Sequence, residues 1–177
     1  MDRPAPETER ARRPTIRYRL RIAVPVALVL LLADCTSKSL AVEHLTPERH
    51  PHQIAGDFLR LTLAYNQGAA MGIPLGPGTR WLLIAASLAA VIFLVAWVWR
   101  SPATATPFRL AAGLVLGGAI GNLLDRLFSP RGVVDFIDVG WHVYRFWTFN
   151  LADVGITAGA VLLTIGLWRQ ELEKERS

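Results

Sequence analysis

The chain has 177 residues, of which 52% are hydrophobic and 19% are charged, and its mean hydropathy is +0.33. Disordered tails, collagen-like repeats and basic nucleic-acid arms do not carry so many apolar side chains, so these classes are excluded and an integral membrane protein is favoured. The pI is near 10.1, but residues 1–21 alone hold seven arginines against three acidic residues. Because this basic excess is one short tail before an apolar run, we expect no nucleic-acid partner.

Four apolar segments are long enough to cross a bilayer, which predicts an all-α integral membrane protein. They lie at about residues 22–42, 81–99, 110–128 and 151–168. The positive-inside rule places the basic tail of residues 1–21, expected to be disordered, in the cytoplasm, and four crossings return the tail of residues 169–177 to the same side. The first segment could instead be a secretory signal, although three further spans follow it. Cys35 is the only cysteine, which excludes an intramolecular disulfide.

The two outer loops each contain a stretch with the alternation of a β-strand, at residues 58–65 and 133–139. Both stretches fall on the outer side, so we expect a small extracytoplasmic β-structure resting on the membrane. The third and fourth spans carry glycines at four-residue spacing, which favours close helix packing in lipid. These glycines are Gly113, Gly117 and Gly121, followed by Gly155 and Gly159.

The spans also contain polar and ionisable side chains, which are costly in a bilayer unless they are paired or face a wet cavity. They are Asp34 and Lys38 in the first span, Asn122, Asp125 and Arg126 in the third, and Asp153 at the start of the fourth. Within each of the first and third spans, the spacing puts the groups on one helix face. All of them fall at the same depth near the outer membrane face, which indicates a shared polar site.

Asp135 belongs to the same region, because its short outer loop begins and ends at the membrane face. Asp135 and Asp153 can therefore approach each other, and two close carboxylates can divide acid and base roles in hydrolysis. The spacing alone leaves open that Asp34–Lys38 and Asp125–Arg126 are merely neutralised pairs. It equally leaves open that Asp135 is a solvated loop residue.

Other kinds of site fit the sequence less well. A serine–lysine dyad would need Lys38, but Ser37 and Ser39 point to other sides of a helix. Glu48, His50 and His52 are possible metal ligands, but they lie in a proline-containing loop without ligand spacing, so we expect no metal site.

Five sequence blocks together resemble the lipoprotein signal peptidases, also called signal peptidase II, the membrane aspartic proteases of bacteria. The blocks are DCTSK at 34–38, YNQGAA at 65–70, GGAIGNLLDR at 117–126, VVDF at 133–136 and FNLAD at 149–153. They occur in the order of the family and reach across all four spans. At Met71-Gly72 the chain departs from the family, which commonly has an aromatic and a small polar residue there, so local substrate contacts are expected to differ.

The resemblance implies four transmembrane helices with both termini cytoplasmic and an extracytoplasmic β-structure that cradles the substrate. It also implies that Asp135 and Asp153 are the catalytic pair. Further residues match motif positions that surround or support the site, and of these Asn66 and Arg126 are expected to contact substrate. The supporting residues are Asp34, Lys38, Asn66, Gly68, Asn122, Asp125, Arg126, Asn150 and Ala152.

The reaction implied by the resemblance is removal of the signal peptide from diacylglyceryl-modified prolipoproteins, just before the lipidated cysteine, by water that the aspartate pair activates. It requires neither a metal nor another cofactor. The protein is then expected in the bacterial cytoplasmic membrane as a multi-pass monomer in contact with lipid, with its active site at the extracytoplasmic face. The alternatives are a small four-helix transport or ion-relay subunit and a non-catalytic membrane scaffold.

Overall fold

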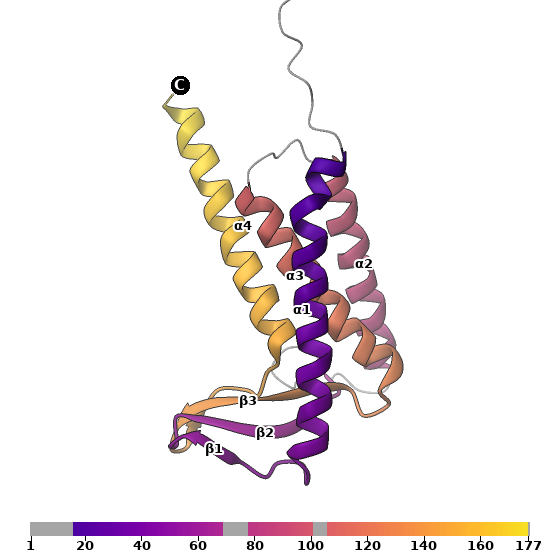
Figure 1. The fold of residues 1–177 in the computed structure, drawn as a ribbon, viewed down its shortest axis with the longest axis vertical. Coiled ribbons are helices and arrows are strands. Elements are labelled where there is room, and N and C mark those ends of the chain that lie inside the picture. The colour runs from indigo at the N-terminus through magenta and orange to yellow at the C-terminus, as the bar shows by residue number, and fades with distance from the viewer. Residues whose placement is uncertain (1–15, 69–77, 101–105, 177) are drawn as a thin grey trace, which may run out of the picture.

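The structure is a computed structural model that describes residues 16–68, 78–100 and 106–176. Four helices form a bundle that stands on a small sheet (Figure 1). They are α1 (Ile16–His44), α2 (Thr79–Arg100), α3 (Thr106–Phe128) and α4 (Leu151–Glu175). Each is long and apolar enough to span a membrane, which confirms the four predicted spans.

The helices extend beyond the apolar segments that predicted them. α1 begins at Ile16 and α4 continues to Glu175, so both run into the segments interpreted as tails. These two ends lie at the same end of the bundle, and the sheet lies at the other end (Figure 1). Residues 1–15 and the Met71-Gly72 departure lie outside the described residues.

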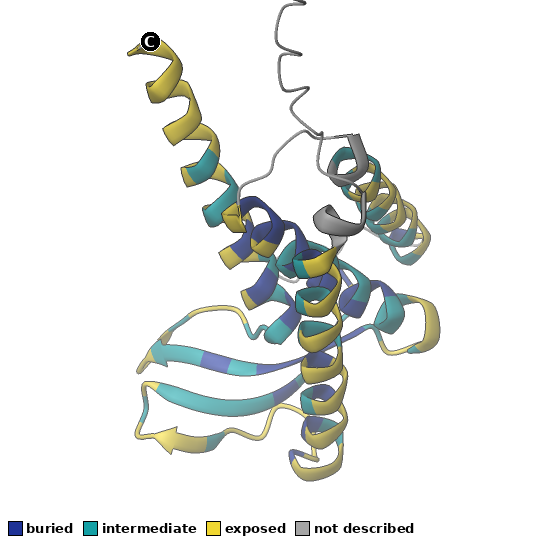
Figure 2. Cartoon of the chain, turned by 45° about the horizontal axis from the view of Figure 1, so that its top comes forward, coloured by how far each residue is buried: buried dark blue, intermediate teal, exposed yellow. Residues whose placement is uncertain are grey.

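α3 is the central helix of the bundle. It packs along α1 and α4 and also contacts α2. More than half of its span is buried inside the protein, whereas α1, α2 and α4 expose most of their apolar surface, as Figure 2 shows by colour. An exposed apolar helix surface is what lipid contact requires, so α3 forms the core of the bundle and the other three helices face the bilayer.

Glycines of α3 let its neighbours approach closely, as their spacing predicted. A Cβ atom built on Gly117 would lie 2.7 Å from the Ala27 carbonyl oxygen of α1, and one on Gly118 would lie 2.4 Å from the Ala152 carbonyl oxygen of α4. No larger residue fits these positions without moving a backbone. The two contacts fix α1 and α4 on either side of α3, which is the geometry that the site needs.

The sheet is antiparallel with the strand order β1-β2-β3-β4. Its strands are β1 (His52–Ala55), β2 (Leu59–Asn66), β3 (Val133–Trp141) and β4 (Tyr144–Arg145). The predicted strands 58–65 and 133–139 are confirmed as β2 and β3, which pair with each other. The short strands β1 and β4 were not expected from the sequence.

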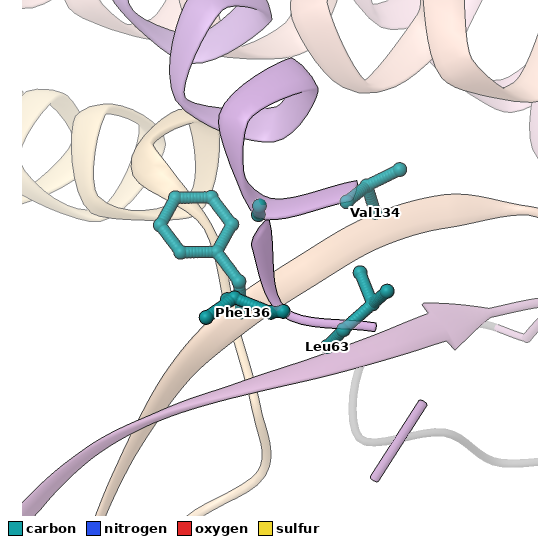
Figure 3. Packing of buried hydrophobic residues seen from close by; sticks show 5 residues of the cluster. Leu63, Val134 and Phe136 are labelled. Atoms are coloured by element: carbon teal, nitrogen blue, oxygen red, sulfur yellow. The ribbon is translucent and has the colours of Figure 1, made fainter. Parts of the chain in front are cut away.

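A hydrophobic cluster docks the sheet against the end of α1. Leu63 of β2 and Val134 and Phe136 of β3 are buried with Ala41 of α1 and with Leu45, which directly follows that helix (Figure 3). Side chains alternate along a strand, so residue 135 points to the other face from its two neighbours. The alternation thus buries Val134 and Phe136 in the cluster and directs Asp135 away from it.

We predict that Gly117→Leu lowers the free energy of unfolding by about 1–3 kcal/mol or more, because the new side chain must displace the α1 backbone at Ala27. Ala160→Leu adds the same side chain to an exposed position of α4 and serves as the matched control. Thermal unfolding in detergent measures both. Equal midpoints for the two variants would contradict the close α1–α3 packing.

Candidate active site

A buried lysine joins α1 to α3 at the sheet end of the bundle. The ammonium of Lys38 forms ion pairs with Oδ2 of Asp34 at 2.7 Å and Oδ2 of Asp125 at 2.9 Å, and it donates a hydrogen bond to Oδ1 of Asn122 at 2.9 Å. Only 5% of the Lys38 side chain is exposed, and Asp34 is fully buried. The i,i+4 pair expected from the sequence is therefore present, and it belongs to a larger network of two ion pairs and one hydrogen bond around the ammonium.

Asp34 also connects α1 to α4. Its Oδ1 accepts a hydrogen bond of 2.8 Å from the backbone N–H of Ala152 in the first turn of α4. This N–H has no partner within its own helix, so a carboxylate near the helix N-terminus is favourable. Gly121 faces the same carboxylate, since a Cβ atom there would lie 2.5 Å from Asp34 Oδ2. Asp34 and Ala152 thus have structural roles beside the site.

The start of α4 forms a capping box that contains one of the two expected catalytic residues. Asn150 is the N-cap, and its Oδ1 accepts from the backbone N–H of Asp153 at 3.0 Å. In return, Oδ2 of Asp153 accepts from the backbone N–H of Asn150 at 3.2 Å. Oδ1 of Asp153 accepts from Nδ2 of Asn122 at 2.8 Å. Both oxygens of the Asp153 carboxylate therefore receive hydrogen bonds, which hold it in place.

Asn150 links this helix start to Asp135. Its Nδ2 donates to Oδ1 of Asp135 at 2.7 Å, and also lies 3.2 Å from both Asn122 Oδ1 and the Val134 carbonyl oxygen. The residue before it, Phe149, pairs with Ile137 of β3 through backbone hydrogen bonds of 2.8 and 3.0 Å. The chain between β3 and α4 is thereby tied to β3, and the two aspartates are brought to one site.

Asp135 lies in a poorly solvated and negatively charged environment. Only 3% of the residue is exposed. Burial, and then the neighbouring charge of Asp153, raise the pKa of Asp135 from its usual 3.8 to about 7, against the opposing effect of hydrogen bonds from Asn150 and Asn66. A carboxyl group of this kind can hold or release a proton near neutral pH.

The other predicted residues gather around the pair. Oδ1 of Asn66 accepts from the Gly68 backbone N–H at 3.0 Å, which leaves its amide nitrogen for the hydrogen bond to Asp135. The guanidinium of Arg126 donates to the Asn122 carbonyl oxygen at 3.2 Å and interacts electrostatically with both Asp135 and Asp153. Oδ2 of Asp125 accepts from the backbone N–H of Val134 at 3.1 Å. The structure therefore brings together all eleven residues predicted for the site.

Residues considered for other chemistries are engaged elsewhere. The hydroxyl groups of Ser37 and Ser39 donate to carbonyl oxygens of their own helix, at 3.0 and 2.9 Å. His50 and His52 stack edge to face with ring centroids 5.3 Å apart. Among the described residues, no three His, Cys, Asp or Glu side chains gather as metal ligands.

A cavity of about 540 Å³ opens at the aspartate pair and runs between α2, α3 and α4. Asp135, Asp153, Asn66, Asn122 and Arg126 form its polar end. Its apolar walls come from α2 and α3 and from the segment before α4, through residues that include Ala90, Leu94, Val115, Ala119, Phe146 and Trp147. The sequence reasoning did not assign these wall residues, because apolar side chains in a membrane span carry no signal that separates a cavity lining from a lipid contact.

Fold and site define a multi-helix membrane protein in which two carboxylates share one partly apolar cavity. Comparison with known proteins identifies the group to which it belongs. The profile of the signal peptidase (SPase) II family matches residues 26–169. The chain belongs to the signal peptidase II family, a family of membrane-bound proteases.

Individual relatives agree with this assignment. The lipoprotein signal peptidase of Syntrophomonas wolfei is 39% identical, with the match covering 85% of this chain and 95% of the relative. The lipoprotein signal peptidases of Mycobacterium tuberculosis and Mycolicibacterium smegmatis are 40% and 41% identical over 83% of this chain. The match covers 71% of the former and 61% of the latter, so this chain spans less than two thirds of the M. smegmatis relative.

Two solved structures, both of bacterial membrane enzymes, share the fold. One has a TM-score of 0.77 and 28% identity, covering 86% of this chain and 90% of the other. The second has a TM-score of 0.72 and 28% identity, covering 82% of this chain and 91% of the other. With its four membrane-spanning helices, the chain is accordingly a bacterial inner-membrane protein.

We predict that stability falls as pH rises toward neutrality because of Asp135. Its pKa is raised from 3.8 to about 7 in the folded protein, so between these values the folded state binds more protons than the unfolded state. Increasing pH then favours unfolding, by an amount on the order of a few kcal/mol at pH 7. Asp135→Asn abolishes this contribution.

The measurement is the difference in thermal midpoint between Asp135→Asn and the wild type in detergent, at several pH values from mildly acidic to slightly alkaline. The difference is expected to grow in favour of the variant as pH rises. A difference that does not change with pH would contradict the raised pKa of Asp135.

Proposed function

We propose that this chain is an aspartic endopeptidase that removes the signal peptide from diacylglyceryl-modified prolipoproteins, cutting just before the lipidated cysteine. Asp135 and Asp153 are its catalytic residues. The observation that carries the proposal is that both carboxylates lie at the polar end of one cavity whose other walls are mostly apolar. The relatives' name, lipoprotein signal peptidase, supports the substrate class.

The cavity suits a substrate that is part peptide and part lipid. Its polar end offers amide and guanidinium donors, from Asn66 and Arg126, for peptide carbonyl groups. Its apolar walls continue along α2 and α3, where a signal-peptide helix and acyl chains can remain in a lipid-like environment. The scissile bond is thereby held at the carboxylates while the lipid part does not leave the membrane.

The aspartate pair supplies the acid and base of hydrolysis. One carboxylate takes a proton from water as the water attacks the scissile carbonyl carbon, while the protonated partner donates to the carbonyl oxygen. A tetrahedral gem-diol forms, and its collapse with proton transfer to the leaving nitrogen breaks the C–N bond. The raised pKa of Asp135 is consistent with the shared proton that this chemistry needs.

The proposed orientation puts the site at the extracytoplasmic face. The basic residues 1–21, of which the last six belong to α1, precede its apolar part and favour a cytoplasmic N-terminus. The sheet and the site lie at the bundle end away from Ile16 and Glu175 (Figure 1). A cytoplasmic location of both termini therefore puts the carboxylates at the outer boundary, where water and the acylated substrate are both present. We propose a monomer, since α3 is enclosed within a single chain.

We predict that purified wild type cleaves a diacylglyceryl-modified prolipoprotein but not its unmodified form, in a gel-shift assay. Asp135→Asn and Asp153→Asn are expected to lower turnover by at least about a hundredfold, because each removes one partner of the acid–base pair. Glu173→Gln, at an exposed position near the end of α4, is the control and should keep wild-type turnover.

Two outcomes would contradict the proposal. Near-normal turnover in a folded Asp135→Asn or Asp153→Asn variant would remove that residue from the catalytic pair. Absence of cleavage by the wild type, with an authentic lipidated substrate, would remove the proposed activity itself.

We predict that Ala90→Trp raises KM for the lipidated substrate at least about tenfold, because the new side chain fills part of the apolar cavity wall. Leu88→Trp, on an exposed part of the same helix that does not line the cavity, is the matched control and should leave KM unchanged. Steady-state kinetics with one lipidated prolipoprotein measure both. The same KM for both variants would exclude this cavity as the substrate site.

A further inference from the structure

We infer that Lys38 acts as a positioning residue which, through the amide of Asn122, makes Asp153 the resting carboxylate and general base and leaves the proton of the pair on Asp135. This inference rests on the proposed function and adds to it the division of labour within the pair. It follows from the directions of hydrogen bonds between described side chains, taken one step at a time.

The first step is the orientation of Asn122. A lysine ammonium has three protons to donate and no acceptor. Two of its partners are Asp34 and Asp125, and the third is Oδ1 of Asn122 at 2.9 Å. A flipped amide would direct an NH₂ group at the ammonium, in a place where both groups are buried. Lys38 therefore fixes Asn122 with its oxygen toward α1.

The second step is the state of Asp153. Once Oδ1 of Asn122 faces Lys38, Nδ2 must face the other way, and it donates to Oδ1 of Asp153 at 2.8 Å. The backbone N–H of Asn150 donates to the other oxygen at 3.2 Å. A proton on either oxygen would compete with an N–H that already points at it, so these hydrogen bonds favour the carboxylate form.

The third step places the proton on Asp135. The capping box turns Oδ1 of Asn150 toward the Asp153 backbone N–H, and Nδ2 donates to Oδ1 of Asp135 at 2.7 Å, a hydrogen bond that by itself favours the carboxylate form of Asp135. Burial outweighs it, because Asp135 is only 3% exposed whereas Asp153 is half-buried, and the ionised Asp153 opposes a second negative charge beside it. One proton shared by the pair then resides on Asp135, which agrees with the raised pKa of this residue.

The charged groups in and around the pair come from α1, α3, β3 and α4, while α2 and β2 contribute uncharged residues to the cavity. They are Asp34 and Lys38 from α1, Asp125 and Arg126 from α3, Asp135 from β3 and Asp153 from α4. Lys38 is paired with Asp34 and Asp125, and its ammonium reaches Asp153 only through the Asn122 amide. Its charge also acts directly on Asp135, so orientation and direct charge are separated by comparing variants.

The resulting proton movements balance over a full turnover. Asp153 takes a proton from water, the water oxygen bonds to the scissile carbon, and Asp135 gives its proton to the carbonyl oxygen. On collapse, Asp153 passes its proton to the leaving nitrogen as the C–N bond breaks, and a gem-diol hydroxyl returns a proton to Asp135. Both residues regain their starting states without an added base.

The test is the pH profile of kcat/KM for the full chain in detergent with the lipidated substrate, whose acidic limb reports protonation of the base. Asn122→Leu keeps the volume but removes the donor, and it is expected to move the acidic limb to higher pH by about one unit or more. Lys38→Met is expected to move the limb in the same direction. In the Asn122→Leu background, Lys38→Met should add little, because its effect passes through Asn122.

Ser39→Ala is the control on α1, since Ser39 is exposed, adjacent to Lys38 and bonded only within its own helix. It should keep the wild-type profile. An unmoved acidic limb in Asn122→Leu, with lower turnover at all pH values, would show a merely structural role and overturn the inference. Equal shifts from Lys38→Met in both backgrounds would also overturn it, because direct charge would then be the cause.

A second measurement applies if Asn122→Leu does not fold. Infrared spectra at mildly acidic pH record the stretch of a protonated carboxyl group, which is expected to disappear in Asp135→Asn and to persist in Asp153→Asn. The reverse pattern would overturn the assignment. Cleavage of the lipidated substrate by wild type and Ser39→Ala tests the proposed function separately. That function can be correct even if the assignment of base to Asp153 and proton to Asp135 is wrong.

Discussion

The site depends on one buried positive charge. Removing an ammonium group from water costs several kcal/mol unless opposite charge and hydrogen-bond acceptors surround it, and Lys38 is held by two carboxylates and an amide from α1 and α3. The same contacts give Asp34 and Asp125 one positive charge to share at the depth where the helices meet the sheet. The need to stabilise one buried lysine thus fixes the spacing of two helices and the orientation of the amide beside the proposed catalytic pair.

The residues at the start of α4 bring Asp153 and Asp135 together beside this network. A capping box is an ordinary way to satisfy the first N–H groups of a helix, but here its two side chains belong to the proposed active site. Oδ1 of Asn150 accepts a hydrogen bond from a backbone N–H of the helix, and its Nδ2 donates to Asp135. Asp153 takes part in the capping box and also accepts from the amide of Asn122. The backbone pairing of Phe149 with Ile137 then holds the sheet at this helix end. Helix capping, sheet docking and the proposed catalysis therefore use the same few residues.

The sequence predicted the features that are local or carried by a motif. Hydropathy located the four spans, i,i+4 spacing located the Asp34–Lys38 pair, and the family motifs named the nine supporting residues that gather around Asp135 and Asp153, but not the apolar cavity walls. It did not predict that α4 continues to Glu175. Residues 169–175 are rich in charged side chains, which lower the hydropathy of the segment but are compatible with an exposed helix. Nor did it predict β1 and β4, which are short and exist through pairing with β2 and β3. The direction of each amide could only be found once its partners were placed in space.

The central claim is that the two carboxylates activate water directly, without a covalent bond to the substrate. The most direct test is a single-turnover reaction in water enriched in oxygen-18, with the released signal peptide analysed by mass spectrometry. The account predicts that the new carboxylate of the peptide carries one oxygen-18 atom in the first turnover. An unlabelled peptide in that turnover would contradict it, since the oxygen would then have come from an aspartate that attacked the carbonyl as a nucleophile.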